Sequence, residues 1–194
     1  AHTISVTGAT AGAQFTILGA IESQTLDVNG ASTFANLDFS ASTTAVTIDA
    51  AAALQVTAGM ANAAVTSFTV TGAGGVDLDA ITLSTTVVTY DASASTGVQS
   101  ITAGASNITI TTGTANDVVD MAATLNANDT IDLGAGTNTL RADIASLTAG
   151  AADLSVVNVS TLRLDGINTD GAIQMDNLAI ANIRFDDAGA ANAH

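Results

Sequence analysis

Aspartate and asparagine side chains are concentrated in the segment 112–141, TGTANDVVDMAATLNANDTIDLGAGTNTLR, where short polar turns alternate with two- or three-residue apolar strands. The carboxylate and amide side chains in these turns include Asp117, Asp129 and Asn138. Calcium is bound in proteins by carboxylate, amide and backbone carbonyl oxygens, about six to eight per ion. Asp117 and Asn138 are 21 residues apart, and this spacing recurs along the chain. We therefore predict that Asp117 and Asn138 lie one above the other on successive coils and hold a calcium ion between them.

The elements that must position these residues are short strands. Apolar triplets with a polar centre recur about every ten or eleven residues, which is strand spacing rather than helix spacing. They fall into two interleaved series with steps near 21 residues, the first at 4–6, 26–28, 46–48, 68–70, 88–90, 108–110 and 131–133, the second at 54–56, 76–78, 98–100, 119–121, 140–142, 162–164 and 183–185. The flanks of each triplet are expected to point inward and its centre outward. This pattern predicts an all-β fold, a right-handed parallel β-helix (β-solenoid) with coils of about 21 residues.

The whole chain, 1–194, is predicted to form one solenoid domain. We expect regular coils over 1–111, degenerate calcium-binding turns over 112–141 and C-terminal coils over 142–194. One short helix is expected near 142–154, because Ile144, Leu147 and Leu154 follow helical spacing behind Asp143 as an N-cap. The chain begins with Ala1 rather than Met, so we expect it to be a fragment of a longer surface protein.

The composition is strongly acidic, with 18 Asp and Glu, three Arg and no Lys, for a formal charge of −15. This balance argues against nucleic acid and anionic membranes as partners and favours cations, although it also serves simple solubility. The chain has no Cys, so a secreted protein of this kind needs a staple other than a disulfide, and calcium is one. No run approaches the ~18 apolar residues of a membrane-spanning helix, so no direct membrane insertion is expected.

The three arginines occupy equivalent positions, within TLRAD, TLRLD and NIRFD. An aspartate follows each arginine two residues later, at Asp143, Asp165 and Asp186. We interpret this pattern as an Arg–Asp ladder on an outer face, because exposed ion pairs mostly shape solubility and register.

The segment 112–141 resembles, in degenerate form, the glycine- and aspartate-rich nonapeptide of repeats-in-toxin proteins, G-G-x-G-x-D-x-U-x. The unit 112–120 keeps Gly113, Asp117 and Val119, and the unit 133–141 keeps Gly134, Gly136 and Leu140 with Asn138 in place of Asp, whereas the unit 124–132 keeps only Asp129 and Ile131. The resemblance implies that Asp117 with the carbonyls of Thr112 and Thr114 faces Asn138 with the carbonyls of Gly134 and Gly136. Asp129, on the opposite edge, has no clear partner.

Over roughly 85–166 the chain is also similar to calcium-binding, repeats-in-toxin-type surface-layer proteins of Gram-negative bacteria. The similarity lies in the strand VTYDAS, in SNITITTGTANDVVDM and NANDTIDLGAGTNTL, and in the alanine-rich SLTAGAADLSVVNVSTLRLDG. It implies a structural protein that is secreted to the bacterial cell surface, binds Ca²⁺ and self-associates into a two-dimensional lattice.

Other interpretations remain open from the sequence. In the simplest alternative, the residues in the turns of 112–141 are solvated turn residues that bind no ion. A stalk or passenger segment of an adhesin would use the same solenoid without a lattice. An ice-binding rod would need a longer regular threonine array, and a polysaccharide-degrading enzyme would need clustered acids, basic groups and sugar-stacking aromatics in a chain that has no Trp and one Tyr.

Overall fold

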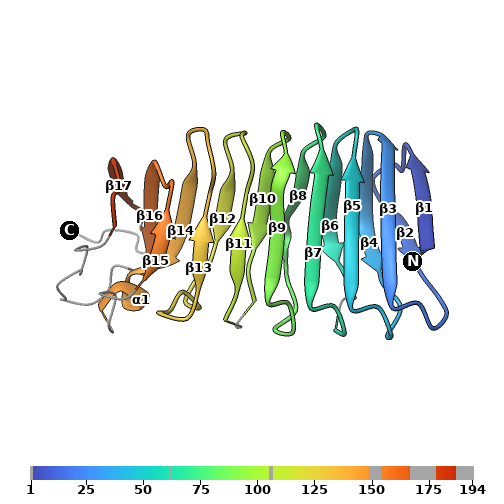
Figure 1. Cartoon of the computed structure of the whole chain (residues 1–194), viewed down its shortest axis with the longest axis horizontal. Coiled ribbons are helices and arrows are strands. Elements are labelled where there is room, and N and C mark those ends of the chain that lie inside the picture. The colour runs from blue at the N-terminus through green and yellow to red at the C-terminus, as the bar shows by residue number, and fades with distance from the viewer. Residues whose placement is uncertain (1, 62, 105–106, 149–153, 167–177, 187–194) are drawn as a thin grey trace, which may run out of the picture.

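The computed structural model is a parallel β-solenoid of about 7 turns with coils of about 22 residues, as the sequence predicts. It describes residues 2–61, 63–104, 107–148, 154–166 and 178–186. The coils stack along one long axis, with the first coil at one end and the last strands at the other (Figure 1). Each coil contributes one strand to each of two sheets, so residues one coil apart in sequence are neighbours in space.

The eight-stranded sheet consists of odd-numbered strands, and the other, called the even-numbered sheet below, consists of the even-numbered strands together with β17. The eight-stranded sheet runs in the order β1 (His2–Thr7), β3 (Ser23–Gly30), β5 (Ala45–Ala50), β7 (Ser67–Gly72), β9 (Thr89–Ser95), β11 (Thr109–Thr111), β13 (Thr130–Asp132) and β15 (Ser155–Val157). The nine-stranded sheet runs in the order β17 (Asn182–Phe185), β16 (Thr161–Asp165), β14 (Thr139–Asp143), β12 (Val118–Asp120), β10 (Gln99–Thr102), β8 (Val76–Thr82), β6 (Leu54–Gly59), β4 (Ser32–Asp38) and β2 (Ala13–Thr16).

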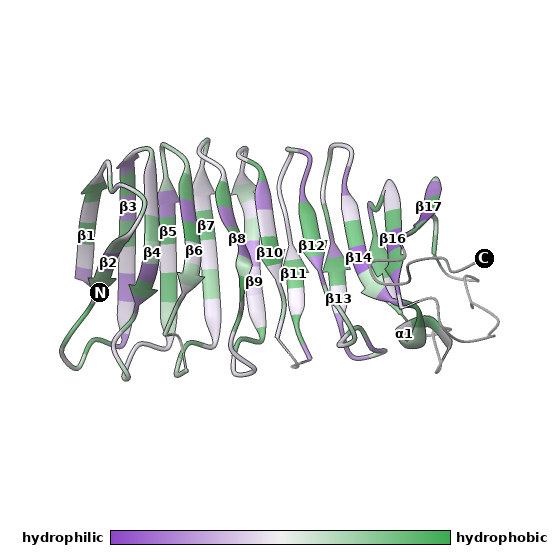
Figure 2. Cartoon of the chain, turned by 180° about the vertical axis from the view of Figure 1, so that it is seen from behind, coloured by the Kyte–Doolittle hydropathy of each residue, from purple (hydrophilic) through white to green (hydrophobic). Residues whose placement is uncertain are grey.

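The core lies between the two sheets and is built from columns of residues in register. Leu26 pairs with Ile48 and Ile48 with Val70, and all three are fully buried. Green apolar positions alternate with paler or purple polar ones along the strands, as expected when one face of each strand packs inward (Figure 2). Phe68 lies in the same interior, with its ring centroid 6.2 Å from that of Phe39 and 6.2 Å from that of Tyr90.

Two valines of the predicted inward series do not point inward. Val88 is 49% exposed and Val98 is 48% exposed, whereas Gln99, predicted to point outward, is fully buried. Val76 pairs with Gln99, a step of 23 residues, whereas Leu54 and Val76 are a step of 22 apart. One extra residue in a corner moves the next side chains to the opposite face, which places Gln99 in the core.

The predicted short helix is present as α1 (Ile144–Thr148), at the end of the solenoid that holds β14 and β15 (Figure 1). The Oδ1 of Asp143 accepts a hydrogen bond from the Ala145 N–H at 2.8 Å, which is the N-cap role expected for this aspartate. Residues 142 and 143 of the predicted helical range belong to β14, residue 154 is not helical, and residues 149–153 lie outside the described residues. No helix in the part of the chain that the structure describes is long and apolar enough to span a membrane.

A buried polar column and the candidate cation site

Polar side chains form a column at the corner where the chain enters the even-numbered sheet. Gln99 begins β10, and Asp117, Asn138 and Ser160 immediately precede β12, β14 and β16. The strand registers place Gln99 beside Asp117, Asp117 beside Asn138 and Asn138 beside Ser160. Gln99, Asp117 and Asn138 are at most 1% exposed. The prediction that Asp117 and Asn138 are stacked on successive coils is therefore confirmed.

The column exists because its side chains replace a backbone hydrogen bond between coils. In the earlier coils the N–H groups of Leu54 and Val76 donate to the carbonyls of Gly75 and Val98, each at 2.8 Å. From β10 onward a side-chain oxygen of the next coil accepts this hydrogen bond instead. The Gln99 N–H donates to Asp117 Oδ1 at 2.7 Å, and the Asp117 N–H donates to Asn138 Oδ1 at 2.9 Å. Each inward polar residue thus satisfies a buried donor of the preceding coil.

The Asn138 amide is fully engaged. Its Oδ1 accepts the Asp117 N–H, and its Nδ2 donates to the carbonyl of Leu133 at 2.6 Å, with Ala135 O at 3.3 Å and Gly134 O at 3.5 Å. The carbonyl of Asn158, on the next coil, lies 3.1 Å from the same nitrogen. The amide nitrogen therefore fills the space that the carbonyl oxygens of this turn surround.

Asp117 occupies the equivalent position one coil earlier, but its carboxylate has no N–H group that could donate a hydrogen bond. Its Oδ1 is satisfied, whereas its Oδ2 is buried and has no hydrogen-bond partner. The Oγ1 of Thr112 is also buried and has none. Burial raises the pKa of the Asp117 carboxyl, and the hydrogen bond from the Gln99 N–H and the nearby Thr112 hydroxyl offset only part of that rise. An ionised carboxylate at this position has no positive charge or full set of donors to balance it.

The two turns also differ in backbone conformation. Gly134 and Gly136 adopt φ of +61° and +107°, whereas Gly113 and Ala115, one coil earlier, do not have positive φ. A Cβ on Gly134 would lie 2.1 Å from the carbonyl oxygen of Gly113. Glycine is therefore required at 134 by the close approach of the preceding coil as well as by φ.

Asp129 lies at the opposite corner, before β13, and not with Asp117 and Asn138. Its Oδ1 accepts the Ile108 N–H at 2.9 Å, and its Oδ2 accepts the Asn126 N–H at 2.8 Å and the Asn126 Nδ2 at 3.1 Å. Both oxygens of this fully buried carboxylate are therefore used to close a turn and to join it to the preceding coil. This arrangement accounts for Asp129 as a structural turn residue.

The predicted ligands fit a cation unevenly. In the first turn Asp117 Oδ2 is a buried oxygen without a hydrogen-bond partner, as a ligand would be, while the Thr112 and Thr114 carbonyls stay predicted ligands. In the other turn Asn138 Nδ2 donates to the Gly134 carbonyl, so this predicted ligand is already engaged by the protein's own amide, and the Gly136 carbonyl stays a predicted ligand. Within the described ranges no three His, Asp or Glu side chains gather as a ready metal-binding group.

Tyr90 and Gln99 extend the polar column inward, and the sequence does not mark either of them. The Tyr90 hydroxyl donates to Gln99 Oε1 at 2.8 Å, and Gln99 Nε2 donates to Ser95 Oγ at 3.1 Å and Gly97 O at 2.9 Å. Burial, and secondly the charge of Asp117, raise the pKa of the Tyr90 hydroxyl above its ordinary value of 10.0. The signal that could have identified Gln99 is the longer corner before it, which is visible only once the register is known.

The arginines stack as predicted, with Arg141 beside Arg163 and Arg163 beside Arg184. Their partners are mostly on neighbouring coils rather than two residues later. Arg141 pairs with Asp120 at 3.1 Å and Arg163 pairs with Asp186. Such pairs link adjacent coils on the outer face of the even-numbered sheet.

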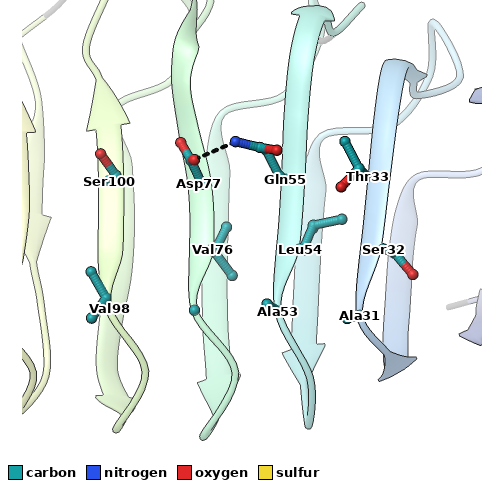
Figure 3. Close-up of a pocket in the computed structure, with 11 residues that line it drawn as sticks. Ala31, Ser32, Thr33, Ala53, Leu54, Gln55, Val76, Asp77, Val98 and Ser100 are labelled. Carbon is teal, nitrogen blue, oxygen red and sulfur yellow. Dashed lines mark hydrogen bonds between the residues drawn. The ribbon is translucent and has the colours of Figure 1, made fainter. Parts of the chain in front are cut away.

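One hollow on the outer surface has a volume of about 410 Å³ and lies over the starts of β4, β6, β8 and β10 (Figure 3). Small residues line it, including Ala31, Ala53 and Gly75. Its polar wall includes Gln55, whose Nε2 donates to Asp77 Oδ2 at 2.8 Å. The hollow is an outward corner groove, and it does not reach the buried column.

Comparisons with known proteins do not identify this chain. No family model, no curated protein and no solved structure matches it.

Proposed function

We propose that this chain is a structural, calcium-stabilised segment of a secreted protein of the bacterial cell surface, and that it self-assembles into a surface layer. The observation that carries the proposal is the parallel solenoid, in which the described strands form two sheets of eight and nine that share one narrow apolar core. Such a stack is a regular rod whose surface repeats coil by coil, which suits a building block of a coat.

The charge of the chain supports the calcium part of this proposal. Copies that each carry a formal charge of −15 repel one another, so close packing in a layer needs cations to offset the repulsion. The unpartnered Oδ2 of Asp117 is a buried oxygen that a cation would satisfy. A bound calcium ion would supply positive charge there and would stabilise the folded coil by mass action.

A non-catalytic role also agrees with the distribution of acids on the described coils. Asp77 and Asp79, which lie close together, are on the outer face of β8. A hydrogen bond with Asp77 raises the pKa of Asp79, with burial and the Asp77 charge as further causes. The groove beside Asp77 is lined mainly by small and apolar residues rather than by aromatic rings that stack on sugars.

The test is assembly of the purified chain in calcium and in chelator, followed by electron microscopy and analytical ultracentrifugation. The proposal expects ordered two-dimensional arrays with calcium and single rods without it. Single rods in both conditions would contradict the surface layer and would favour the stalk or passenger segment of an adhesin, which needs the same solenoid but no lattice.

A further inference from the structure

The turns 112–117 and 133–138 correspond residue for residue on successive coils. Thr111 pairs with Asp132 before the turns, and Val118 pairs with Thr139 after them. The Ala135 N–H donates to the Gly113 carbonyl at 2.9 Å within this segment, so the two turns are in contact as well as in register. A difference between the residues that end the turns, Asp117 and Asn138, is therefore a difference at one structural position.

Asn138 shows what this position requires. The side chain must present an acceptor to the N–H of the preceding coil, and Asn138 Oδ1 does so at 2.9 Å. Its second atom must satisfy the carbonyl oxygens of its own turn, and Asn138 Nδ2 does so through its 2.6 Å hydrogen bond to Leu133 O. An amide meets both requirements without any ligand.

Asp117 meets only the first requirement. Its Oδ1 accepts the Gln99 N–H at 2.7 Å, but its Oδ2 is an acceptor at the place where Asn138 has a donor. Oδ2 has no partner, and neither has the neighbouring Thr112 Oγ1, although Asp117 is 1% exposed and Thr112 is 2% exposed. The Thr112 hydroxyl can donate one hydrogen bond to the carboxylate but supplies no positive charge, and a cation would complete this arrangement.

Resting on the calcium part of the proposed function, we propose that calcium is bound in the single turn 112–117, at Asp117 Oδ2 and Thr112. Asn138 is not a ligand: in the next turn its side-chain amide takes the place of the ion. The geometry thus departs from an ion shared between the two turns. One position of the column needs an external charge, and the equivalent position one coil later supplies its own donor.

The experiment compares the thermal midpoints of unfolding of the parent chain, of Asp117→Asn and of Asn138→Asp, each measured in chelator and in calcium. The parent is expected to gain several degrees in calcium. Asp117→Asn is expected to exceed the parent in chelator, because its amide supplies the missing donor, and to lose the calcium response. Asn138→Asp is expected to fall below the parent in chelator and to recover more than the parent does when calcium is added.

Asp129→Asn is the matched control, since Asp129 is an equally buried carboxylate whose oxygens are both satisfied. It should lose stability in chelator and keep the parent's response to calcium. An Asp117→Asn variant that is less stable than the parent in chelator, or that retains the calcium response, would overturn the single-turn site. A parent that assembles into arrays but shows no calcium shift would also overturn it, while leaving the structural role of the chain intact.

Discussion

The Asp117 N–H donates to Asn138 Oδ1 at 2.9 Å between two adjacent coils, although the residues are 21 positions apart in the sequence. In this hydrogen bond, as in the one from the Gln99 N–H to Asp117 Oδ1, a side chain takes over the backbone's role of joining coils. It makes the column from Gln99 to Asn138 a continuous buried structure, and it makes the stability of one coil depend on the residue type in the next.

Replacing Asn138 with Ala should destabilise the chain strongly. The variant leaves the Asp117 N–H and the Leu133 carbonyl without the partners that they have in the parent. Because a buried polar group without a partner costs ~1–3 kcal/mol, we expect a loss of about 3 kcal/mol in the free energy of unfolding, measured by urea denaturation.

Asn116→Ala is the control for this substitution. Asn116 is exposed, and its Oδ1 accepts the Thr137 N–H at 2.7 Å between the same two turns. Water replaces such a partner at the surface, so its loss should remain below about 1 kcal/mol. Equal losses in the two variants would show that burial of the Asn138 amide is not what matters.

The pairing of Arg163 with Asp186 should make the last strand, β17, sensitive to acid. The hydrogen bond from Arg163 is the main cause that lowers the pKa of Asp186 below its ordinary 3.8, and Arg184 adds to it. A lowered pKa stabilises the folded state above pH 3.8, and this contribution is lost as the pH falls through the lower folded value. The protection of the β17 amides from hydrogen exchange, taken relative to the unprotected rate at the same pH, should therefore fall below pH 3.8.

Asp186→Asn provides the comparison. This variant should show low protection of the β17 amides already at neutral pH and little further loss of protection in acid. Acid-induced exchange of β17 that is the same in the parent and in Asp186→Asn would assign the acid effect to another group.

The sequence predicts the solenoid well because the fold repeats one local requirement. Every coil needs inward apolar residues at strand spacing, and the arginines at 141, 163 and 184 reveal the coil length without any structure. Small errors of register cost little in such a pattern. Leu26 pairs with Ile48 rather than with Val46, but a shift of two residues leaves the same face inward.

The candidate site is less predictable because it depends on corners rather than strands. One extra corner residue turns Gln99 inward, and the apolar pattern around it does not reveal this. Spacing brings Asp117 and Asn138 together, but it does not show that the Asn138 amide would turn its Nδ2 toward the carbonyls of its own turn. That orientation is decided by hydrogen bonds with the backbone of adjacent coils.

Gly134→Ala should test how closely successive coils approach. The substitution meets both a positive φ and the Gly113 carbonyl oxygen at 2.1 Å. Gly12→Ala is the matched variant, since Gly12 has a φ of +93° but no atom within 4 Å of an added Cβ. We expect Gly12→Ala to cost about 1–2 kcal/mol, from φ alone, in the free energy of unfolding measured by chemical denaturation. Gly134→Ala should cost at least ~2 kcal/mol more, since a backbone atom must shift; similar costs would mean that the coils are free to separate at this turn.

Tyr90 should resist ionisation in the folded chain. It is the only tyrosine, so tyrosinate absorbance in the ultraviolet reports this residue alone. Burial and the Asp117 charge raise the pKa of Tyr90 above 10.0, and the Tyr90 hydroxyl donates a hydrogen bond to Gln99 Oε1. In the unfolded chain the hydroxyl ionises near its ordinary value, so the free energy of unfolding should fall as the pH rises beyond 10.0. Tyrosinate should therefore appear together with the loss of β-sheet circular dichroism.

Ionisation near pH 10 with the sheet signal intact would show that Tyr90 is not shielded from solvent in the core. The variant Tyr90→Phe should lose the part of the alkaline sensitivity that Tyr90 causes.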